Sequence, residues 1–246
     1  ANDSNVESQP DALPWFVRRL FVRALADAGA VVAQTDVQAR RLRERFDVGP
    51  TVIPSGYPPV EDIQTHDERE FFLWVGRLDR EQKRPHDFLD VAESVPEATF
   101  EMVGPAGQDE AYAERIEQRA QKLDNVTYRG LVDSDRIHEY YRDAKALVNT
   151  SAFEGFPSTF LEAWRYDTPV LSLAVRPSRY TVPDADAGYA DGETDRLVEL
   201  VRSLADDPDG RAAISGPAHE YYSEHLTTDA VVDQYRRLFD RLTDGT

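Results

Sequence analysis

The chain has 246 residues, 41% of them hydrophobic, and a formal net charge of −18. It contains no cysteine, which excludes disulfides and thiolate metal sites. The excess of carboxylates argues against nucleic acid or an anionic lipid surface as a charge-driven partner. No apolar run approaches the roughly 20 residues that span a bilayer, and no signal peptide is recognisable. We therefore expect a cytoplasmic protein without a transmembrane segment.

The basic residues are almost all arginine. Lysine occurs only at Lys83, Lys122 and Lys145, so 25 of the 28 basic residues are arginine. Acidic residues are spread through the whole chain instead of forming a tail. Such a surface suits high salt, where screening removes the self-repulsion of the charges. We expect a halophilic protein from a haloarchaeon.

The first 50 residues read as the end of an α/β domain. We predict two helices that flank one strand, at Leu13–Ala28, Asp36–Phe46 and Ala30–Gln34 respectively. Residues 1–50 are therefore assigned to the remnant of an N-terminal, Rossmann-like domain. Residues 51–59 follow as a short strand, Thr51–Pro54, and a linker stiffened by three prolines.

The middle of the chain, residues 60–226, alternates short β-rich runs with amphipathic helical runs. This alternation predicts an α/β fold, a Rossmann-like parallel sheet with helices on both faces and right-handed crossovers. The predicted strands are Phe71–Val75, Thr99–Val103, Val126–Gly130, Ala146–Thr150 and Pro169–Leu173. The predicted helices are Arg84–Ser94, Ala111–Leu123, Asp135–Asp143 and Ser158–Tyr166.

The end of the chain shows only helical patterns after Asp191. The last helix, Ala230–Leu242, repeats apolar residues along one face. We expect residues 227–246 to form a helix that returns toward the N-terminal domain.

Three loops that follow predicted strands carry residues suited to a phosphorylated ligand, since ligands of open α/β sheets bind beyond the carboxyl ends of the strands. In "WVGRLDREQKRP", Gly76 permits close backbone approach, and Arg77 and Lys83 can meet a diphosphate as a fork and a point charge. A lone arginine is more often simply solvated. Lys83 is more informative, because this chain almost never uses lysine.

The second loop, "NTSAFEGFPSTFLEAW", contains two glutamates separated by seven residues, Glu154 and Glu162. Between them lie a turn and a helix start whose free backbone N–H groups suit an anion; they comprise Gly155, Phe156, Pro157, Ser158 and Thr159. We predict that Pro157 is the first helical residue. A carboxylate beside a phosphate pocket suits neutral hydroxyls, so the stretch predicts a nucleotide-sugar site. The structural alternative is two solvated carboxylates.

The third loop, "NVTYRGLVDSDRI", places Leu131 and Val132 where backbone can line a base pocket. Its triplet Asp133-Ser134-Asp135 imitates a metal-binding acidic motif. The simpler interpretation is that Ser134 or Asp133 caps the following helix. We therefore predict no metal site.

Taken in order, these stretches resemble the retaining glycosyltransferases of the Glu-x7-Glu type, which have the GT-B fold and form the glycosyltransferase group 1 family. The resemblance covers roughly residues 28–240. The matching stretches are "VIPSGYPP", "FFLWVGRLDREQKRP", "FEMVGPAG", "NVTYRGLV", "ALVNTSAFEGFPSTFLEAW" and "TPVLSL".

The resemblance implies that Glu154 contacts hydroxyls of the donor sugar and Glu162 the ribose. Arg77 and Lys83 match the pair that neutralises the diphosphate, so we assign Arg77, Lys83 and Glu154 as catalytic. The donor-binding residues are then Gly76, Gly104, Leu131, Val132, Gly155, Phe156, Pro157, Ser158, Thr159 and Glu162. The implied reaction is retaining transfer of a hexosyl group from a nucleoside-diphosphate sugar to a saccharide or lipid-linked acceptor. The family needs no metal and no other cofactor.

The sequence departs from the family pattern at three points. The family usually has glycine before its "PV" strand, where Asp167 lies nearby, and a glycine-rich loop after it, whereas residues 174–187 contain no glycine. Such enzymes also have two similar domains, and this chain begins near the end of the first. Either the chain is a fragment of a longer protein, or a partner supplies the other half. We favour a fragment that supplies the donor-binding half, with acceptor binding and any peripheral membrane contact left to the N-terminal domain.

Two other functions stay open at this point. A nucleotide-sugar 2-epimerase shares the architecture, but the additional acids and histidines expected in its cleft are not found. A module that binds nucleotide sugars without catalysis is the other alternative. Transfer, epimerisation or simple retention of a labelled donor would separate the three.

Overall fold

The structure is a computed structural model that describes residues 14–244. The chain divides into two compact units. The first contains the described parts of residues 1–58 and 224–246 together with residues 154–158, and the second contains residues 59–153 and 159–223. Each unit has its own core and is taken by itself.

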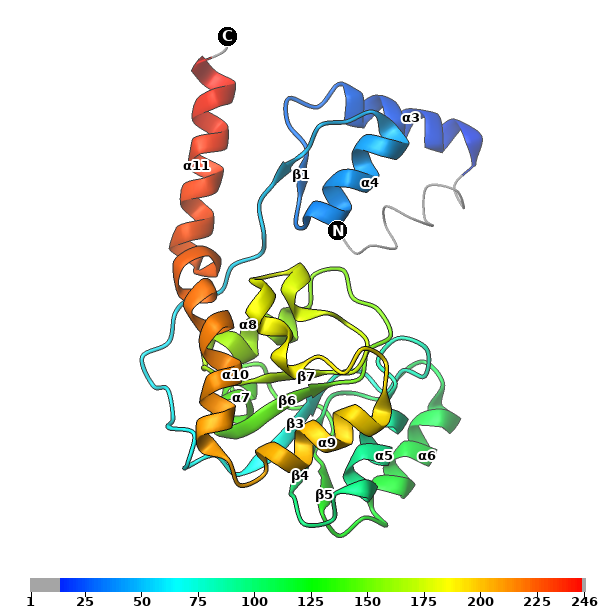
Figure 1. Cartoon of the computed structure of the whole chain (residues 1–246). Helices are drawn as coiled ribbons and strands as arrows, with labels where there is room; N and C mark the ends of the chain where they lie inside the picture. The colour runs from blue at the N-terminus through cyan, green and yellow to red at the C-terminus, as the bar shows by residue number, and fades with distance from the viewer. Residues whose placement is uncertain (1–13, 245–246) are drawn as a thin grey trace. The chain divides into compact units, whose positions relative to one another are not determined.

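The first unit is built around a two-stranded parallel sheet. Its elements are α3 (Trp15–Ala26), β1 (Val32–Ala33), α4 (Asp36–Phe46), β2 (Thr51–Val52) and α11 (Thr228–Asp244) (Figure 1). The predicted helix at 36–46 is confirmed, and the hydroxyl of Thr35 caps it by accepting from the backbone N–H of Gln38 at 3.1 Å. The two strands are shorter than predicted, and predicted residue Leu13 lies outside the described part of the chain.

Apolar side chains of α11 contribute to this unit's core. Val231 and Leu238 are buried together with Ile53, which follows β2. The backbone of Tyr57 pairs with residues 226 and 228 at the start of α11. The last helix therefore belongs to the same compact unit as β1 and β2.

The second unit contains a five-stranded parallel sheet in the order β5-β4-β3-β6-β7 (Figure 1). Its strands are β3 (Phe71–Val75), β4 (Phe100–Val103), β5 (Val126–Tyr128), β6 (Ala144–Asn149) and β7 (Val170–Ser172). All five predicted strands are present, with ends that differ by one or two residues. The prediction of an α/β fold with a parallel sheet is confirmed.

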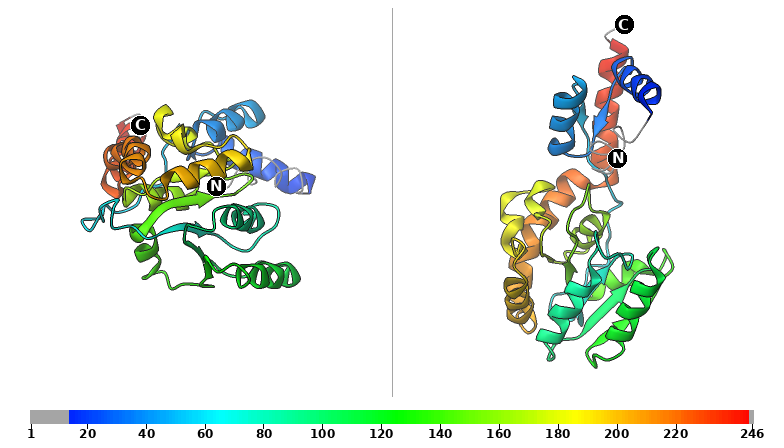
Figure 2. Two further views of the ribbon diagram at one scale, coloured as in Figure 1. Left: turned by 60° about the horizontal axis from the view of Figure 1, so that its bottom comes forward. Right: turned by 90° about the vertical axis from the view of Figure 1, so that its right-hand side faces the viewer.

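Helices flank this sheet on both faces, as Figure 2 shows from two sides. They are α5 (Pro85–Ser94), α6 (Glu110–Ala120), α7 (Ile137–Asp143), α8 (Ser158–Arg165), η1 (Pro177–Arg179), η2 (Pro183–Gly188), α9 (Thr194–Leu204) and α10 (Pro208–Tyr221). The short π-helix η3 (Tyr222–Leu226) follows α10, and its last three residues belong to the first unit. Apolar residues of α5, α6 and α9 share one core with Phe72 and Phe100. On the other face, the ring of Phe71 lies 6.3 Å from that of Tyr140 in α7, as the alternation of side chains along a strand requires.

The strand order creates a switch point beside β3. From β3 the chain proceeds through β4 and β5 to one edge of the sheet, and β6 and β7 lie on the other side of β3. The loops that leave β3 and β6 therefore diverge from neighbouring strands at the carboxyl edge. Open α/β sheets bind their ligands in the crevice that such a divergence opens.

Candidate functional site

The loops after β3 and β6 are held together by one buried hydroxyl. Thr150, which is fully buried, accepts a hydrogen bond from the indole N–H of Trp74 at 3.0 Å. Its Oγ1 lies 2.8 Å from the backbone carbonyl of Lys83, to which it donates. The backbone N–H of Ala152 also donates to the carbonyl of Gln82 at 2.8 Å. The two loops at the switch point are therefore one connected structure.

The β3 loop owes its compact shape to Asp79. Its carboxylate accepts from the backbone N–H groups of Glu81 and Gln82 at 3.1 and 2.7 Å, and its carbonyl accepts from Arg84 at 2.8 Å. An aspartate that binds the backbone two and three residues ahead is a common way to fold a short turn. This turn leaves Lys83 half-buried at the end of the loop.

Two glycines form the closest contact at the carboxyl edge. Gly104, which follows β4, has φ of +143°, and a Cβ added there would lie 1.8 Å from the carbonyl oxygen of Gly76. A Cβ on Gly76 would lie 3.3 Å from the side-chain stem of Lys83. Gly104 also donates to the carbonyl of Gly130, which follows β5, at 2.8 Å. The ends of β3, β4 and β5 therefore meet through backbone, and the contact between Gly76 and Gly104 has no room for a side chain on Gly104.

The charges in this region are not all balanced. Arg77 is exposed, and within residues 14–244 its guanidinium makes no hydrogen bond or ion pair. Lys83 has its stem against Gly76 and interacts with other groups of the chain. In a protein of net charge −18, an arginine without a carboxylate partner is available to an anionic ligand.

In α8, Glu162 is largely buried, with 16% of its side chain exposed, and its carboxylate lies 3.3 Å from Arg165. Burial raises its pKa above the ordinary value, although Arg165 and His138 partly oppose the shift. Nearby in the same helix, the hydroxyl of Thr159 is buried and lacks a hydrogen-bond partner among the described residues. A buried acceptor and a buried unpaired hydroxyl are costly unless something binds them.

The segment that contains Glu154 belongs to the first compact unit. Glu154 is half-buried and makes an interaction with another part of the chain. Helix α8 begins at Ser158, which confirms the start of the predicted span Ser158–Tyr166, and Pro157 precedes the helix by one residue instead of being its first residue. The site described here consists of residues of the second unit alone.

Of the residues after β5, Leu131 is 76% exposed and Val132 is half-buried. The predicted cap by Asp133 or Ser134 is wrong. Helix α7 begins at Ile137, and its N-cap is Arg136, which makes no side-chain cap bond. The carbonyl of Asp133 instead accepts from the backbone of Arg136 and Ile137, which form a turn before the helix. Among the described residues, no group of three histidine or carboxylate side chains is placed to hold a metal.

Asp167, in the turn between α8 and β7, adopts φ of +53°. Its carboxylate lies 3.1 Å from Nε2 of His66. Burial raises the pKa of Asp167, but hydrogen bonds from His66 and Ser215 and the charges of two histidines outweigh burial and lower it overall. Aspartate tolerates the left-handed region better than most residues, and here its carboxylate has partners that glycine cannot offer.

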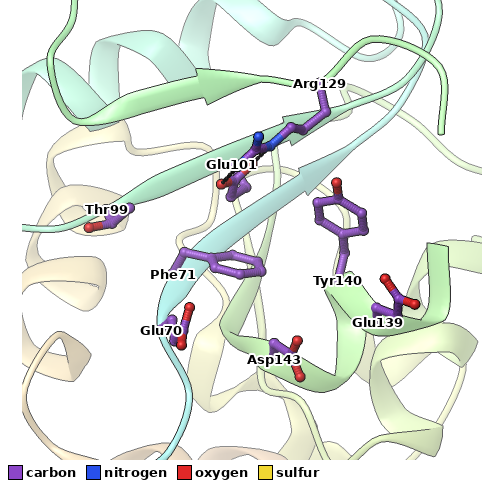
Figure 3. Close-up of a pocket in the computed structure, with 8 residues that line it drawn as sticks. All are labelled: Glu70, Phe71, Thr99, Glu101, Arg129, Glu139, Tyr140 and Asp143. Atoms are coloured by element: carbon purple, nitrogen blue, oxygen red, sulfur yellow. Dashed lines mark hydrogen bonds and ion pairs between the residues drawn. The ribbon is translucent and has the colours of Figure 1, made fainter. Parts of the chain in front are cut away.

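A cavity of about 310 Å³ lies over the face of the sheet that α7 covers (Figure 3). Glu70 and Thr99 directly precede β3 and β4, Arg129 directly follows β5, and Tyr140 belongs to α7, so the cavity runs along this face of the sheet. In its lining, Arg129 makes two hydrogen bonds of 2.7 Å to Glu101. Sequence reasoning missed this pair, although a glutamate inside the apolar strand "FEMV" was a signal of it.

No helix in the described part of the chain has both the length and the apolar character needed to cross a membrane.

Comparison with known families gives a match to the Glycosyl transferases group 1 over residues 60–220. A lipopolysaccharide 1,6-galactosyltransferase of Salmonella typhimurium is 36% identical over 124 residues, which are 47% of this chain and 32% of that protein. A 2-deoxystreptamine N-acetyl-D-glucosaminyltransferase of Streptomyces fradiae is 32% identical over 142 residues, 55% of this chain and 33% of that protein. The chain therefore spans about a third of the length of these relatives.

Solved structures show the same fold. A sucrose-phosphate synthase from Thermosynechococcus elongatus superimposes with a TM-score of 0.76 at 23% identity, over 99% of this chain and 66% of that one. The Anabaena protein Alr3699/HepE in complex with UDP gives a TM-score of 0.77 at 19% identity, over 95% and 70% of the two chains. At these identities the likeness establishes the GT-B architecture alone.

Proposed function

Because the chain belongs to the group 1 glycosyl transferases, we propose that it supplies the donor-binding half of an enzyme that transfers a hexosyl group from a nucleoside-diphosphate sugar to a saccharide or lipid-linked acceptor. The observation that carries the proposal is the pair of loops joined at the switch point. There Thr150 fixes the backbone of Lys83 beside the loop that leads into α8. Open α/β sheets generally bind their ligands at such a switch point, which supports the proposal.

We assign the parts of the donor to this edge as follows. Arg77 and Lys83 bind the diphosphate, together with Thr159 in the first turn of α8. A phosphate oxygen would provide the buried hydroxyl of Thr159 with the partner that it lacks. Gly76 and Gly104 allow the nucleotide to approach the backbone, and residues 131–132 line the base.

The two glutamates have different roles in this proposal. Glu162 accepts hydrogen bonds from the ribose hydroxyls, which compensates for its burial. Glu154 accepts from hydroxyls of the transferred sugar and orients it. The configuration of the sugar is retained, because the acceptor attacks on the face that the diphosphate leaves.

Catalysis in this proposal is electrostatic. Negative charge gathers on the diphosphate as the bond to the sugar breaks, and Arg77 and Lys83 stabilise that charge. Fixed positive groups aimed at developing charge are commonly the largest contribution to catalysis. With two cations and a helix start around the diphosphate, we propose that the reaction needs no divalent metal.

Isothermal titration calorimetry with UDP, GDP and ADP, each with and without EDTA, tests the proposal. We expect one nucleotide to bind with an affinity that the chelator leaves unchanged. Loss of binding in EDTA would overturn the metal-free mechanism. Failure of all three nucleotides to bind would overturn the donor-binding function.

A further inference from the structure

The loop after β7 contains no glycine between residues 174 and 187. It contains two short 3-10 helices, η1 and η2, and Asp186 of η2 links them. Its carboxylate accepts from the backbone N–H of Ser178 at 2.9 Å and from the Ser178 hydroxyl at 2.8 Å. The loop is therefore held in a defined conformation by its own side chains.

Two large side chains of the loop make contacts that stabilise its conformation. Arg176 pairs with Asp186 at 3.2 Å, and its guanidinium lies 4.6 Å from the centre of the Tyr189 ring. Tyr180 is buried, and its ring lies 6.1 Å from that of Phe160 in α8. The loop is thus braced on the helix that contains Thr159 and Glu162.

Arg179, between these anchored residues, is exposed and has no partner. Within the second unit, all of which is described, four cationic side chains make no hydrogen bond, ion pair or ring contact: Arg77, Lys122, Arg179 and Arg196. Lys122 and Arg196 lie on or beside helices. Arg77 and Arg179 lie in loops that leave the carboxyl ends of β3 and β7. Asp184 in η2 is the loop's remaining charge without a partner.

The order of the strands gives the order of the ligand's parts. The base is assigned to the loop after β5, and the diphosphate to the loops after β3 and β6. Neighbouring strands are about 4.8 Å apart, so β7 lies about 10 Å from β3. That separation corresponds to the far side of a hexose attached to the diphosphate.

We infer that Arg179 binds a carboxylate on the donor sugar, and that the donor is therefore a nucleoside-diphosphate uronic acid. The inference rests on the proposed function, because it uses the same donor site. A guanidinium can hold a carboxylate by two parallel hydrogen bonds, which a neutral hydroxymethyl group cannot replace. In this proposal the carboxylate is the ligand of Arg179, just as the diphosphate is the ligand of Arg77.

The test compares a uronic acid donor with its neutral counterpart on the base that the protein binds. The calorimetric pairs are UDP-glucuronate and UDP-glucose, GDP-mannuronate and GDP-mannose, or ADP-glucuronate and ADP-glucose. We expect the uronic acid form to bind about tenfold more tightly or better. Arg179→Gln should remove that preference and leave the affinity for the nucleoside diphosphate unchanged.

Arg196→Gln is the matched control, because it removes the same charge from an exposed, unpaired arginine on α9. It should keep the preference for the uronic acid. Arg179→Lys should keep part of it, since lysine preserves the charge without the fork. A wild-type protein that binds both sugars equally, or an Arg179→Gln variant with unchanged preference, would overturn the inference while nucleotide binding still supported the donor site.

Discussion

Two regions of the second unit treat charge in opposite ways. In the cavity of Figure 3, over the face of the sheet that α7 covers, Arg129 and Glu101 form a bidentate pair, and Glu101 is almost fully buried. At the carboxyl edge, Arg77 is exposed without a partner among the described residues, and the hydroxyl of Thr159 is buried without one. The cavity satisfies the charges of this pair internally, whereas the carboxyl edge leaves polar groups that a ligand can satisfy.

For locating a ligand site, this difference in the pairing of polar groups is more informative than the volume of the cavity. A paired charge has already recovered part of its desolvation cost, so it has little left to offer a ligand. An unpaired cation or hydroxyl recovers that cost only when a ligand arrives. We therefore interpret the cavity on the α7 face as structural, and the carboxyl edge, whose polar groups are less completely paired, as the candidate site.

The largest expected effect comes from the glycine contact at the carboxyl edge. Gly104→Ala places a methyl group 1.8 Å from the carbonyl of Gly76 at a left-handed φ. We expect unfolding to become easier by about 4 kcal/mol or more, or the chain to fail to fold. Gly130→Ala is the control, because its φ is +66° but nothing lies within 4 Å of the added methyl. It should cost about 1–2 kcal/mol in urea unfolding. Equal effects would show that the close approach is not required.

A crossed pair of variants separates the two regions directly. Lys83→Ala should weaken nucleotide binding up to about a hundredfold with little change in stability. Arg129→Met should leave binding unchanged and cost about 1–3 kcal/mol of stability, because it leaves the buried Glu101 without its partner. The range is modest because Arg129 itself is 47% exposed. Calorimetry and urea unfolding of both variants provide the measurements. Reduced nucleotide affinity in Arg129→Met would place the ligand in the cavity on the α7 face instead of at the carboxyl edge.

The two glutamates allow a finer division within the donor site. Glu162→Gln should weaken nucleotide and nucleotide sugar alike by about tenfold, since glutamine keeps one acceptor and loses the charge. Glu154→Gln should spare the nucleotide and weaken only the sugar-bearing ligand. Because burial raises the pKa of Glu162, its ionised form costs stability at neutral pH, and the glutamine variant should melt no lower than the parent. Binding to the parent should weaken as the pH falls through that raised pKa, and binding to the variant should not. Changes within about 0.5 kcal/mol in both variants would make the two glutamates ordinary surface residues.

The smallest effect concerns salt. Screening of the −18 net charge should raise the melting temperature by a few degrees as KCl rises toward molar concentration, about 2–4 °C per kcal/mol for a chain of this size. The same screening should weaken diphosphate binding at the carboxyl edge. Scanning calorimetry and nucleotide titrations over one KCl series measure both trends. A melting temperature that falls steadily would contradict the halophilic interpretation.

The sheet could be predicted from the sequence because its buried parallel strands are short apolar runs, such as "FFLWV" for β3. Tertiary contacts in the folded chain agree with this local pattern. It also placed Gly76, Arg77 and Lys83 in one loop, since their spacing is local. The link from Thr150 to the carbonyl of Lys83 joins residues 67 positions apart and could not be read from either loop. The start of α7 was misplaced because Asp133 and Ser134 have capping chemistry, but the turn before the helix uses backbone groups instead.

The hydroxyl of Thr150 has a mechanical consequence. It contacts the carbonyls of both Lys83 and Arg84, at 2.8 and 3.0 Å, while it also accepts from the core residue Trp74. A loop fastened in this way cannot swing independently of the strand beside it, so the backbone amides of residues 82–84 and 150–152 should open to solvent in one shared event. Their hydrogen-exchange rates should report a single opening free energy. Lys83 would then bind each diphosphate from a loop that is already ordered, so binding would not have the entropic cost of ordering a flexible loop.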